Sequence, residues 1–442
     1  MSDPETWWRE GVVYQIYPRS FLDSDGDGVG DLAGITDRVG YLSWLGVDAI
    51  WLSPVYRSPM ADFGYDISDH CAIDPVFGTM ADMDQLIAAS HDAGLKVMLD
   101  WVPNHTSDQH PWFVESRSSR TSPKRDWYVW RDGGGGPDGA RPNNWVASFG
   151  GKAWTWDDTT EQWYLHNFLP EQPDLNWGHP DVEQAQHDVL RFWLDRGIDG
   201  FRADVVHLIG KDPSLPDLPD DLAEIPPVAV HDDPLTHGLL RRIRKVLDER
   251  DGDRPMVGEV NLGRPDLLAP YYGDGDELHL VFNFTLQWQP WTAPGWAKMV
   301  ERAERAFAPN GAWPVWVLSN HDVVRHRTRY GGSEGRARVA AVVLLTLRGT
   351  PFIYAGEEIG AQDVELADDE RIDPGGRDGC RSPLAWTPDP GHGWNTERPW
   401  LPFEGNAAAA NVETLRKDET SILWLYRNLL AARRASPALR RG

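Results

Sequence analysis

Residues 200–205 are Gly-Phe-Arg-Ala-Asp-Val, and this stretch decides the fold. It begins as a short buried strand would, but two charged side chains, Arg202 and Asp204, lie near its end. An amphipathic stretch precedes it at residues 182–196, and another follows it at residues 235–249. A strand between two helices is typical of a parallel sheet that is covered by helices.

The same alternation runs along most of the chain. Short apolar runs predict strands at residues 12–17, 49–52, 97–101, 200–204, 256–260, 280–284, 315–318 and 352–354. Amphipathic stretches predict helices at residues 35–45, 80–93, 182–196, 235–249, 296–307 and 335–347, and a last helix at residues 420–435. Eight parallel strands fit a closed (β/α)8 TIM barrel better than an open sheet. We therefore expect an α/β protein built on a TIM barrel.

Two intervals interrupt this alternation. Residues 103–179 are rich in Trp, Gly, Pro and Asn and show little helical periodicity, which predicts a subdomain inserted after the third strand. Residues 211–233 are rich in Pro and Asp and predict a loop after the fourth strand. The barrel would then consist of residues 1–102 and 180–442.

Composition excludes several classes of function. The 442 residues include 43 Lys and Arg against 68 Asp and Glu, a formal net charge of −25. Such a surface repels nucleic acid and anionic membranes, so neither is an expected partner. Two cysteines, Cys71 and Cys380, are too few for a disulfide framework or a zinc site. With no signal peptide and no membrane-spanning run, the sequence predicts a soluble cytoplasmic protein, and it does not indicate an oligomeric state.

Polar side chains gather where the predicted strands end. These residues are Asp100, Asn104, His105, Arg202, Asp204, Glu259, His321, Asp322, Glu357 and Glu358. A structural ion pair explains any one of them, but not the whole set. Active sites of TIM barrels lie at the carboxyl ends of the strands. The sequence therefore predicts an active site with several carboxyl groups at this end of the barrel.

Four motifs in this set carry a family resemblance. They are DWVPNH at residues 100–105, GFRADV at 200–205, GEV at 258–260 and SNHD at 319–322. With them the chain resembles glycoside hydrolase family thirteen, the α-amylase clan, close to bacterial α-glucosidases and oligo-1,6-glucosidases. Two further segments, ADFGYD at residues 61–66 and QPDLNW at residues 172–177, resemble the α-glucosidase branch.

The resemblance implies roles for the motif residues in this chain. Asp204 resembles the nucleophile, Glu259 the general acid/base, and Asp322 the third carboxylate. Arg202 resembles the arginine that keeps the nucleophile ionised. The remaining residues resemble groups that hold the glucose ring: Asp62, Tyr65, His105, Phe149, Phe168, His321, Arg377 and Arg381. Asp62 and Arg377 would close the pocket and make the enzyme exo-acting, whereas Phe149 and Phe168 fit a core role equally well.

Glycosidic cleavage explains why two carboxyl groups are needed. One donates a proton to the leaving oxygen, and the other, about 5–5.5 Å away in retaining enzymes, attacks the sugar carbon. Arg202 lies two residues before Asp204 on one strand, so both side chains face the same way and Arg202 can keep Asp204 ionised. The negative charges of Asp204 and Asp322 favour the protonated form of Glu259, as an acid requires.

A separate acidic loop, Asp-Ser-Asp-Gly-Asp-Gly-Val-Gly-Asp at residues 23–31, suits a hard cation with oxygen ligands. It resembles the start of an EF-hand loop, but Gly34 stands where the bidentate Glu would be. The family resemblance implies Ca²⁺, with Mg²⁺ as an alternative. The implied ligands are Asp23, Asp25, Asp27, Asp31 and the carbonyl of Val29. The loop could also be a solvated acidic turn.

Several functions stay open at this point. The expected function is a retaining, exo-acting α-glucosidase that acts on short oligosaccharides. Val205 resembles the α-1,6 type, while ADFGYD and the short loop after the fourth strand favour α-1,4 linkages slightly. A transglucosylase, or a sugar isomerase of the trehalose- or isomaltulose-forming type, would use the same site, and a non-catalytic interaction protein on this barrel is a remote alternative. The chain also ends before the small all-β domain that usually follows the barrel in the family, so we expect that domain to be absent.

Overall fold

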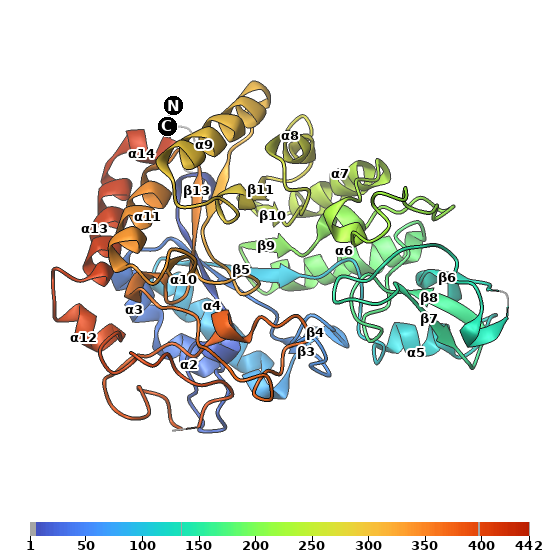
Figure 1. The fold of residues 1–442 in the computed structure, drawn as a ribbon, viewed down its shortest axis with the longest axis horizontal. Helices are drawn as coiled ribbons and strands as arrows, with labels where there is room; N and C mark the ends of the chain where they lie inside the picture. Colours follow the sequence, from blue (N-terminus) through green and yellow to red (C-terminus); the bar gives the residue numbers. More distant parts are fainter. Residues whose placement is uncertain (1–5, 134, 397, 442) are drawn as a thin grey trace.

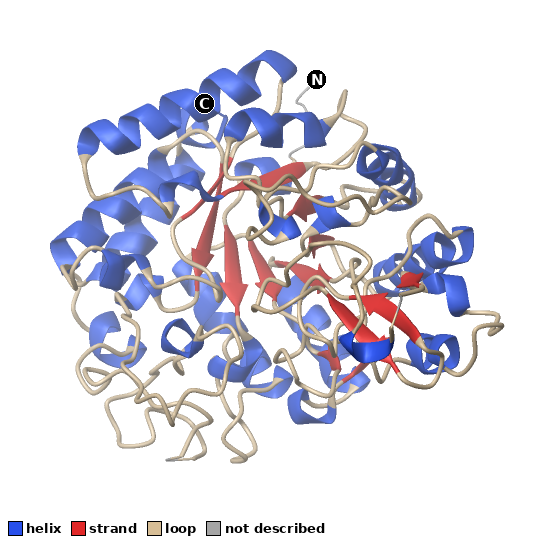
Figure 2. Cartoon of the chain, turned by 45° about the vertical axis from the view of Figure 1, so that its right-hand side comes forward, coloured by secondary structure: helices blue, strands red, loops and turns tan. Residues whose placement is uncertain are grey.

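A computed structural model describes residues 6–133, 135–396 and 398–441, and its centre is a closed barrel of eight parallel strands (Figures 1 and 2). Around the barrel the order is β1, β13, β12, β11, β10, β9, β5, β2. The strands are Val13–Ile16 (β1), Ala49–Leu52 (β2), Lys96–Trp101 (β5), Gly200–Ala203 (β9), Met256–Gly258 (β10), Leu280–Asn283 (β11), Val315–Val317 (β12) and Thr350–Tyr354 (β13). The TIM barrel predicted from the sequence is confirmed.

Helices surround the barrel (Figure 2). They are Trp7–Glu10 (α1), Leu32–Asp37 (α2), Val39–Leu45 (α3), Met80–Asp92 (α4), Pro180–Asp195 (α6), Leu235–Leu247 (α7), Pro265–Leu268 (α8), Ala293–Phe307 (α9), His326–Arg329 (α10), Glu334–Thr346 (α11), Val412–Arg416 (α12), Ile422–Ala435 (α13) and Pro437–Arg441 (α14). The single helix predicted at residues 35–45 was wrong. Arg38 leaves the helical conformation, with φ −106° and ψ 3°, and its N–H caps α2 before α3 begins.

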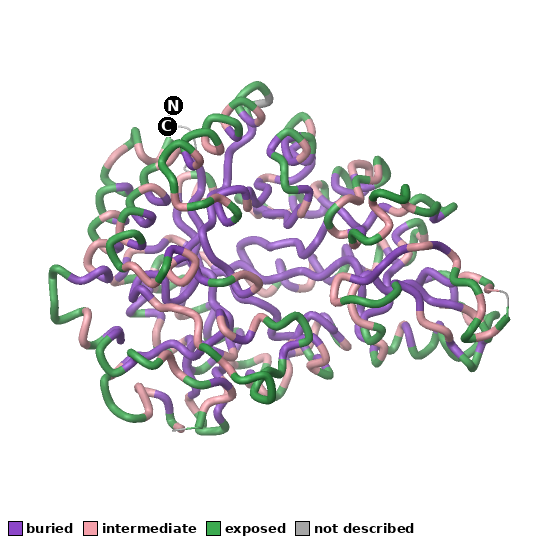
Figure 3. Tube along the Cα trace, viewed as in Figure 1, coloured by how far each residue is buried: buried purple, intermediate pink, exposed green. Residues whose placement is uncertain are grey.

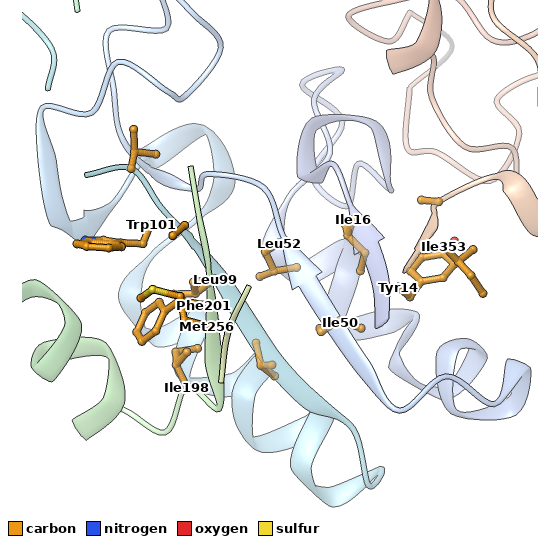
Figure 4. Packing of buried hydrophobic residues seen from close by; sticks show 14 of the residues in the cluster. Tyr14, Ile16, Ile50, Leu52, Leu99, Trp101, Ile198, Phe201, Met256 and Ile353 are labelled. Atoms are coloured by element: carbon orange, nitrogen blue, oxygen red, sulfur yellow. The ribbon is translucent and has the colours of Figure 1, made fainter. Parts of the chain in front are cut away.

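The core follows the two-residue period of the strands. Side chains of one set, including Val13, Trp51 and Met98, form a buried cluster that fills the barrel. The alternate set packs between the strands and the helices, and Figure 4 shows part of it around Ile50, Leu99 and Phe201. Figure 3 shows the same result as continuous buried segments along the strands. Arg202 and Asp100 have the inward parity of Met98, and their Cα atoms are partners in the β5–β9 ladder.

The segment between β5 and α6 has a small sheet of its own. It contains α5 (Pro111–Arg117) and the antiparallel strands β6 (Trp130–Arg131), β8 (Gln162–Leu165) and β7 (Trp154–Asp157), in that order across the sheet. This part lies to one side of the barrel in Figure 1. Its apolar cluster includes Trp145, Trp154 and Trp163, together with Leu215 from the loop after β9. A two-stranded sheet, β3 (Tyr56–Arg57) with β4 (Asp69–Ile73), follows β2.

Two further observations concern the chain as a whole. Within residues 6–133, 135–396 and 398–441, no helix is long and apolar enough to cross a membrane. Cys71 and Cys380 are both free, and burial raises the pKa of their thiols to about 11 and about 12.

Candidate active site

A cavity of about 620 Å³ lies where the barrel strands end. Asp204 follows β9, Glu259 follows β10 and Asp322 comes after β12, so the barrel brings the three carboxyl groups into one cavity. The predicted residues that line it are Asp62, Tyr65, His105, Phe149, Phe168, Asp204, Glu259, Asp322 and Arg377. Arg202, His321 and Arg381 are almost fully buried and contact these lining residues from behind.

Arg202 joins the two carboxyl groups expected to perform the chemistry. Its Nη1 lies 2.6 Å from Oδ1 of Asp204, and its Nη2 lies 2.5 Å from Oε2 of Glu259. Nη1 also donates to Oδ1 of Asp100, 2.8 Å away. The contact with Asp204 was expected, but the contact with Glu259 was not. One guanidinium group therefore contacts both carboxyl groups.

The charges around Arg202 are unevenly matched. Burial raises the pKa of Asp204 well above its ordinary value, Arg202 lowers it, and the charges of Glu259 and Asp100 raise it again. Burial likewise raises the pKa of Asp100 to about 7, against the effect of Arg202. One positive charge therefore serves three carboxyl groups. This mismatch in charge favours a proton on Asp100 or Asp204.

Glu259 is held by its neighbours on both oxygens. Asn261 donates from Nδ2 to Oε1 at 3.0 Å, and the backbone N–H of Val205 donates to Oε2 at 3.2 Å. Val205 has a φ of 34°, in the left-handed region that a β-branched residue rarely adopts. Backbone strain of this kind clusters at functional sites, and here it lies in the residue directly after Asp204.

An ion pair between Asp62 and Arg377 lies at the cavity wall. Nη2 of Arg377 is 2.5 Å from Oδ1 of Asp62. Asp373 accepts from Nε of the same arginine at 2.8 Å, and Gln172 donates to the second oxygen of Asp62 at 3.0 Å. Burial raises the pKa of Asp62, while Arg377 lowers it. The pair therefore sits in a network that fixes both partners.

Asp322 faces two arginines. Nη1 of Arg377 and Nη2 of Arg381 lie 3.2 and 3.4 Å from its Oδ1. Burial opposes ionisation of Asp322, but the neighbouring His321, Arg377 and Arg381 outweigh it and bring its pKa below the ordinary carboxyl value. Near neutral pH, where the His321 ring is uncharged, the two arginines carry this effect. Asp322 is therefore a carboxylate near neutral pH, able to accept hydrogen bonds from sugar hydroxyls.

The two predicted histidines lie at different depths. Burial lowers the pKa of His105 to about 4 and that of His321 to about 3, so both rings are neutral near pH 7. His105 lines the cavity, with its Nε2 3.1 Å from Nε2 of Gln172. His321 lies behind Tyr65, whose hydroxyl is 2.5 Å from His321 Nε2. His321 thus contacts the cavity through Tyr65 in this structure.

Phe149 and Phe168 both line the cavity and are only partly buried. Their ring centroids are 6.0 Å apart, and Phe168 is 5.0 Å from the ring of His105. The guanidinium of Arg377 lies 5.0 Å from the ring centroid of Phe149. Of the two roles open for these rings, their position agrees with the pocket and not with the barrel core.

Three residues of this site were not assigned from the sequence. Gln172 contacts both Asp62 and His105, and it is the first residue of the QPDLNW segment, which was the available signal. Asn261 is two residues after Glu259 and could have been found by that spacing. Asp373, which binds Arg377 and Arg381, lies in an irregular acidic loop and gave no signal.

The acidic loop divides into two parts. Ligand atoms of Asp23, Asp25 and Asp27 lie within 4.8 Å of one another. Asp31 instead caps α2 by accepting from the N–H of Gly34 at 2.6 Å, and it also accepts from Ser24. Only part of the expected ligand set therefore comes together here.

Comparison with known proteins shows the family. Residues 15–442 match the family described as Alpha amylase, catalytic domain. A probable alpha-glucosidase of Rhizobium meliloti (strain 1021) is 44% identical, over 99% of this chain and 84% of that protein. An oligo-1,6-glucosidase of Parageobacillus thermoglucosidasius is 38% identical, over 97% of this chain and 84% of that protein.

Solved structures give the same result. The alpha-glucosyl transfer enzyme XgtA is 45% identical with a TM-score of 0.92, over 99% of this chain and 86% of that one. A variant of the trehalulose synthase MutB is 35% identical with a TM-score of 0.93, over 99% of this chain and 86% of that one. A cavity with three carboxyl groups at the strand ends of a TIM barrel, and a family match from residue 15 onward, lead to one conclusion. The chain belongs to the α-amylase family, glycoside hydrolase family thirteen, and is a glycoside hydrolase.

Proposed function

We propose that this protein is a retaining, exo-acting α-glucosidase that releases terminal α-linked glucose from short oligosaccharides. The observation that carries the proposal is the contact of one guanidinium, Arg202, with both Asp204 and Glu259. This contact supports the proposal, because Asp204 could then act as nucleophile and Glu259 as proton donor within one cavity. The names of the two glucosidase relatives support the same class of substrate.

The reaction proceeds in two steps. Asp204 attacks the anomeric carbon while Glu259 gives its proton to the leaving oxygen, which forms a glucosyl ester on Asp204. Glu259, now a base, takes a proton from water, and the water oxygen attacks the same carbon and frees Asp204. Arg202 favours the carboxylate form of Asp204 in the first step and as the leaving group in the second. Two displacements at one carbon retain the α configuration.

Exo action is inferred from the ion pair of Asp62 and Arg377 in the cavity wall, because both side chains can form hydrogen bonds with the hydroxyls at the non-reducing end of a glucose ring. Asp322, His105 and Tyr65 add polar groups around that ring. A longer chain would have to break the ion pair to pass, so the terminal glucose is the unit released.

The finer part of the proposal concerns which glycosidic linkage is cleaved and which molecule accepts the glucosyl group. We propose a slight preference for α-1,4 over α-1,6 linkages, although Val205 and the oligo-1,6-glucosidase relative favour α-1,6 linkages. Transfer of glucose to another hydroxyl, or isomerisation of a disaccharide, is the second candidate. The likeness to an alpha-glucosyl transfer enzyme and to a trehalulose synthase supports it, because the same intermediate would serve.

The test is hydrolysis of p-nitrophenyl α-glucoside by the wild type and by Asp204→Asn, with maltose and isomaltose measured in parallel. We expect α-glucose as the first product and a loss of at least about a thousandfold in the variant, because the covalent nucleophile is gone. β-Glucose as the first product, or a variant with near-normal rates, would contradict the mechanism. The maltose-to-isomaltose ratio and the fraction of transfer products decide linkage and acceptor.

We also propose that the loop of residues 23–31 binds Ca²⁺, or Mg²⁺ in its place, in a structural role. The three carboxylates of Asp23, Asp25 and Asp27 support this, since hard cations take oxygen ligands. The ion would neutralise a cluster of like charges. The ion takes no part in catalysis, which we assign to Asp204 and Glu259.

A further inference from the structure

A buried amide lies on the inner face of the barrel, where a core position would be apolar. Gln15 is on β1, two residues after Val13, so both side chains have the same inward parity. Its exposed fraction is only 1%. Burial of a polar side chain is costly unless it forms hydrogen bonds, so the partners of Gln15 indicate its role.

The amide nitrogen of Gln15 has two such partners. Nε2 lies 2.7 Å from Nδ1 of His321, and it donates to Oγ of Ser53 at 3.3 Å. An amide nitrogen can only donate, so Nδ1 of His321 accepts. Burial lowers the pKa of His321 to about 3, and the neutral ring carries a single hydrogen near pH 7. That hydrogen therefore lies on Nε2.

The other side of the imidazole favours the same tautomer. Nε2 of His321 is 2.5 Å from the hydroxyl oxygen of Tyr65 and 3.4 Å from Oδ2 of Asp322. Because Asp322 is a carboxylate near neutral pH, it attracts an N–H and repels a bare nitrogen lone pair. The contacts at both ring nitrogens thus agree on the position of the hydrogen.

Packing fixes the plane of the ring but not its hydrogen. The ring of Tyr17 is nearly parallel to the imidazole of His321 at a centroid distance of 5.6 Å, and Trp51 meets it edge-on at 6.1 Å. The two tautomers have the same shape, so these contacts do not distinguish them. A hydrogen-bond donor at Nδ1 does distinguish them, and Gln15 supplies it.

The tautomer of His321 decides where Tyr65 directs its own hydrogen. When the Tyr65 oxygen accepts from His321, its hydroxyl can donate to Oδ2 of Asp100, 3.1 Å away. Asp100 also accepts from Nη1 of Arg202, the same nitrogen that contacts Asp204. With the opposite tautomer, Tyr65 would donate to His321, and Asp100 would lose this donor.

We propose that Gln15 is a positioning residue that keeps the hydrogen of His321 on Nε2. Through this ring it directs the hydroxyl of Tyr65 to Asp100, the carboxyl group that shares Arg202 with the nucleophile. The effect on catalysis rests on the proposed α-glucosidase function, whereas the position of the hydrogen does not.

The first measurement is NMR spectroscopy of the wild type with isotope-labelled histidine. Long-range correlations between carbon-bound protons and ring nitrogens show which nitrogen carries a hydrogen. The signals that are absent from His321→Gln identify this ring. We expect a neutral ring with its hydrogen on Nε2. A hydrogen on Nδ1 would mean that Gln15 presents its oxygen to the ring, and it would overturn the inference.

Gln15→Met removes the donor with little change in the shape of the side chain. We expect signals of both His321 tautomers in this variant. With p-nitrophenyl α-glucoside, kcat should fall by about tenfold and KM should change by less than about twofold, because one hydrogen bond in the network around the nucleophile is lost. A Gln15→Met variant that keeps its hydrogen fully on Nε2 would show that Gln15 does not set the tautomer.

Val13→Ala is the matched control, because it changes another buried side chain of the same parity on β1. It should lower the melting temperature but keep the wild-type tautomer of His321 and the wild-type kcat. An equal loss of kcat in Val13→Ala and Gln15→Met would mean that Gln15 acts by packing alone, against the inference. A folded wild type with its hydrogen on Nε2 but no turnover would overturn the α-glucosidase proposal while supporting the assigned tautomer.

Discussion

Arg377 and Asp62 are separated by 315 residues in the sequence, yet Nη2 of one lies 2.5 Å from Oδ1 of the other. The contact links the loop after β13 to the loop after β2, and only β1 lies between these two strands in the barrel. Asp373 holds the arginine and Gln172 holds the carboxylate, so neither partner depends on the other alone for its position. The pair can therefore be disrupted without removing the loops that carry it.

Asp62→Asn should reduce activity more than stability. The amide keeps the shape but not the charge, and Arg377 retains Asp373 and Asp322. Truncating one partner of a buried charge pair costs about 2–5 kcal/mol, so we expect kcat/KM for maltose to fall about 100-fold, mainly through KM. Steady-state kinetics and thermal melting measure both effects. Asp368→Asn, at a position with a 97% exposed side chain, should behave as the wild type. Wild-type kinetics in Asp62→Asn would contradict the role of the pair.

Glu259→Gln should separate the two steps of the reaction. Loss of a general acid costs about 10²–10⁴-fold, but only where the leaving group needs a proton. Maltose hydrolysis should therefore be lost, while p-nitrophenyl α-glucoside still forms the glucosyl ester and gives a burst of nitrophenol. Azide needs no base and should restore turnover. Stopped-flow absorbance measures the burst. Equal losses on both substrates, without rescue, would contradict the assignment of Glu259.

The acid limb of the pH profile tests the charges around Arg202. Burial raises the pKa of Asp204, so kcat/KM should fall off at a higher pH than an ordinary carboxyl value of about 3.9. Asp100 raises that pKa further, because its negative charge disfavours a second one nearby. In Asp100→Asn the pKa of Asp204 should fall and the acid limb should move to lower pH. A move to higher pH would mean that Asp100 acts mainly by holding Arg202.

Patterns along the chain were sufficient to predict the barrel, because each strand is a local apolar run and each helix a local periodicity. The exception shows the limit. The apolar period of residues 35–45 continues through Arg38, and only the backbone turn at Arg38 divides α2 from α3. Periodicity reports which faces are buried, and it is insensitive to a single residue that leaves the helical conformation.

Sequence patterns predicted those residues of the site that directly follow a barrel strand. Asp204 and Glu259 follow β9 and β10, and such ends converge in any TIM barrel. Asp373 and Trp288 lie in loops whose sequences show no hydrophobic periodicity, and their positions depend on how those loops fold over the barrel. The sequence also did not indicate how deeply each side chain is buried. His321 and Arg381 contact residues of the site but lie behind the cavity surface.

Calcium should stabilise the loop of residues 23–31. Asp23 is buried and accepts backbone N–H groups of Asp25, Gly26 and Gly28, so its carboxylate already organises the turn. Ion binding adds RT ln(1 + [L]/Kd), about 2.7 kcal/mol at a hundred times Kd. We expect calcium to raise the melting temperature of chelator-treated protein, and Asp27→Asn to reduce the rise. Calorimetric titration that detects no binding would contradict the proposal.

Lys211 and Asp174 connect the loop after β9 to the inserted segment. Nζ of Lys211 lies 3.2 Å from Oδ2 of Asp174, and it also donates to Asn104 and to the carbonyl of Leu208 at 2.9 and 2.8 Å. Both side chains are buried, and burial lowers the pKa of Lys211 although Asp174 raises it.

Lys211→Met should destabilise the fold by about 3–5 kcal/mol, because it leaves the Asp174 carboxylate buried without its cation. Adding Asp174→Asn removes that charge, so the double variant should be more stable than Lys211→Met alone. Lys417→Met breaks an exposed ion pair with Glu413 and should lower the free energy of unfolding by less than about 1 kcal/mol. Denaturant unfolding compares the variants. If the double variant is no more stable than the single one, the cost of Lys211→Met comes from lost packing of its side chain and not from an uncompensated charge, and the loop after β9 is held by shape alone.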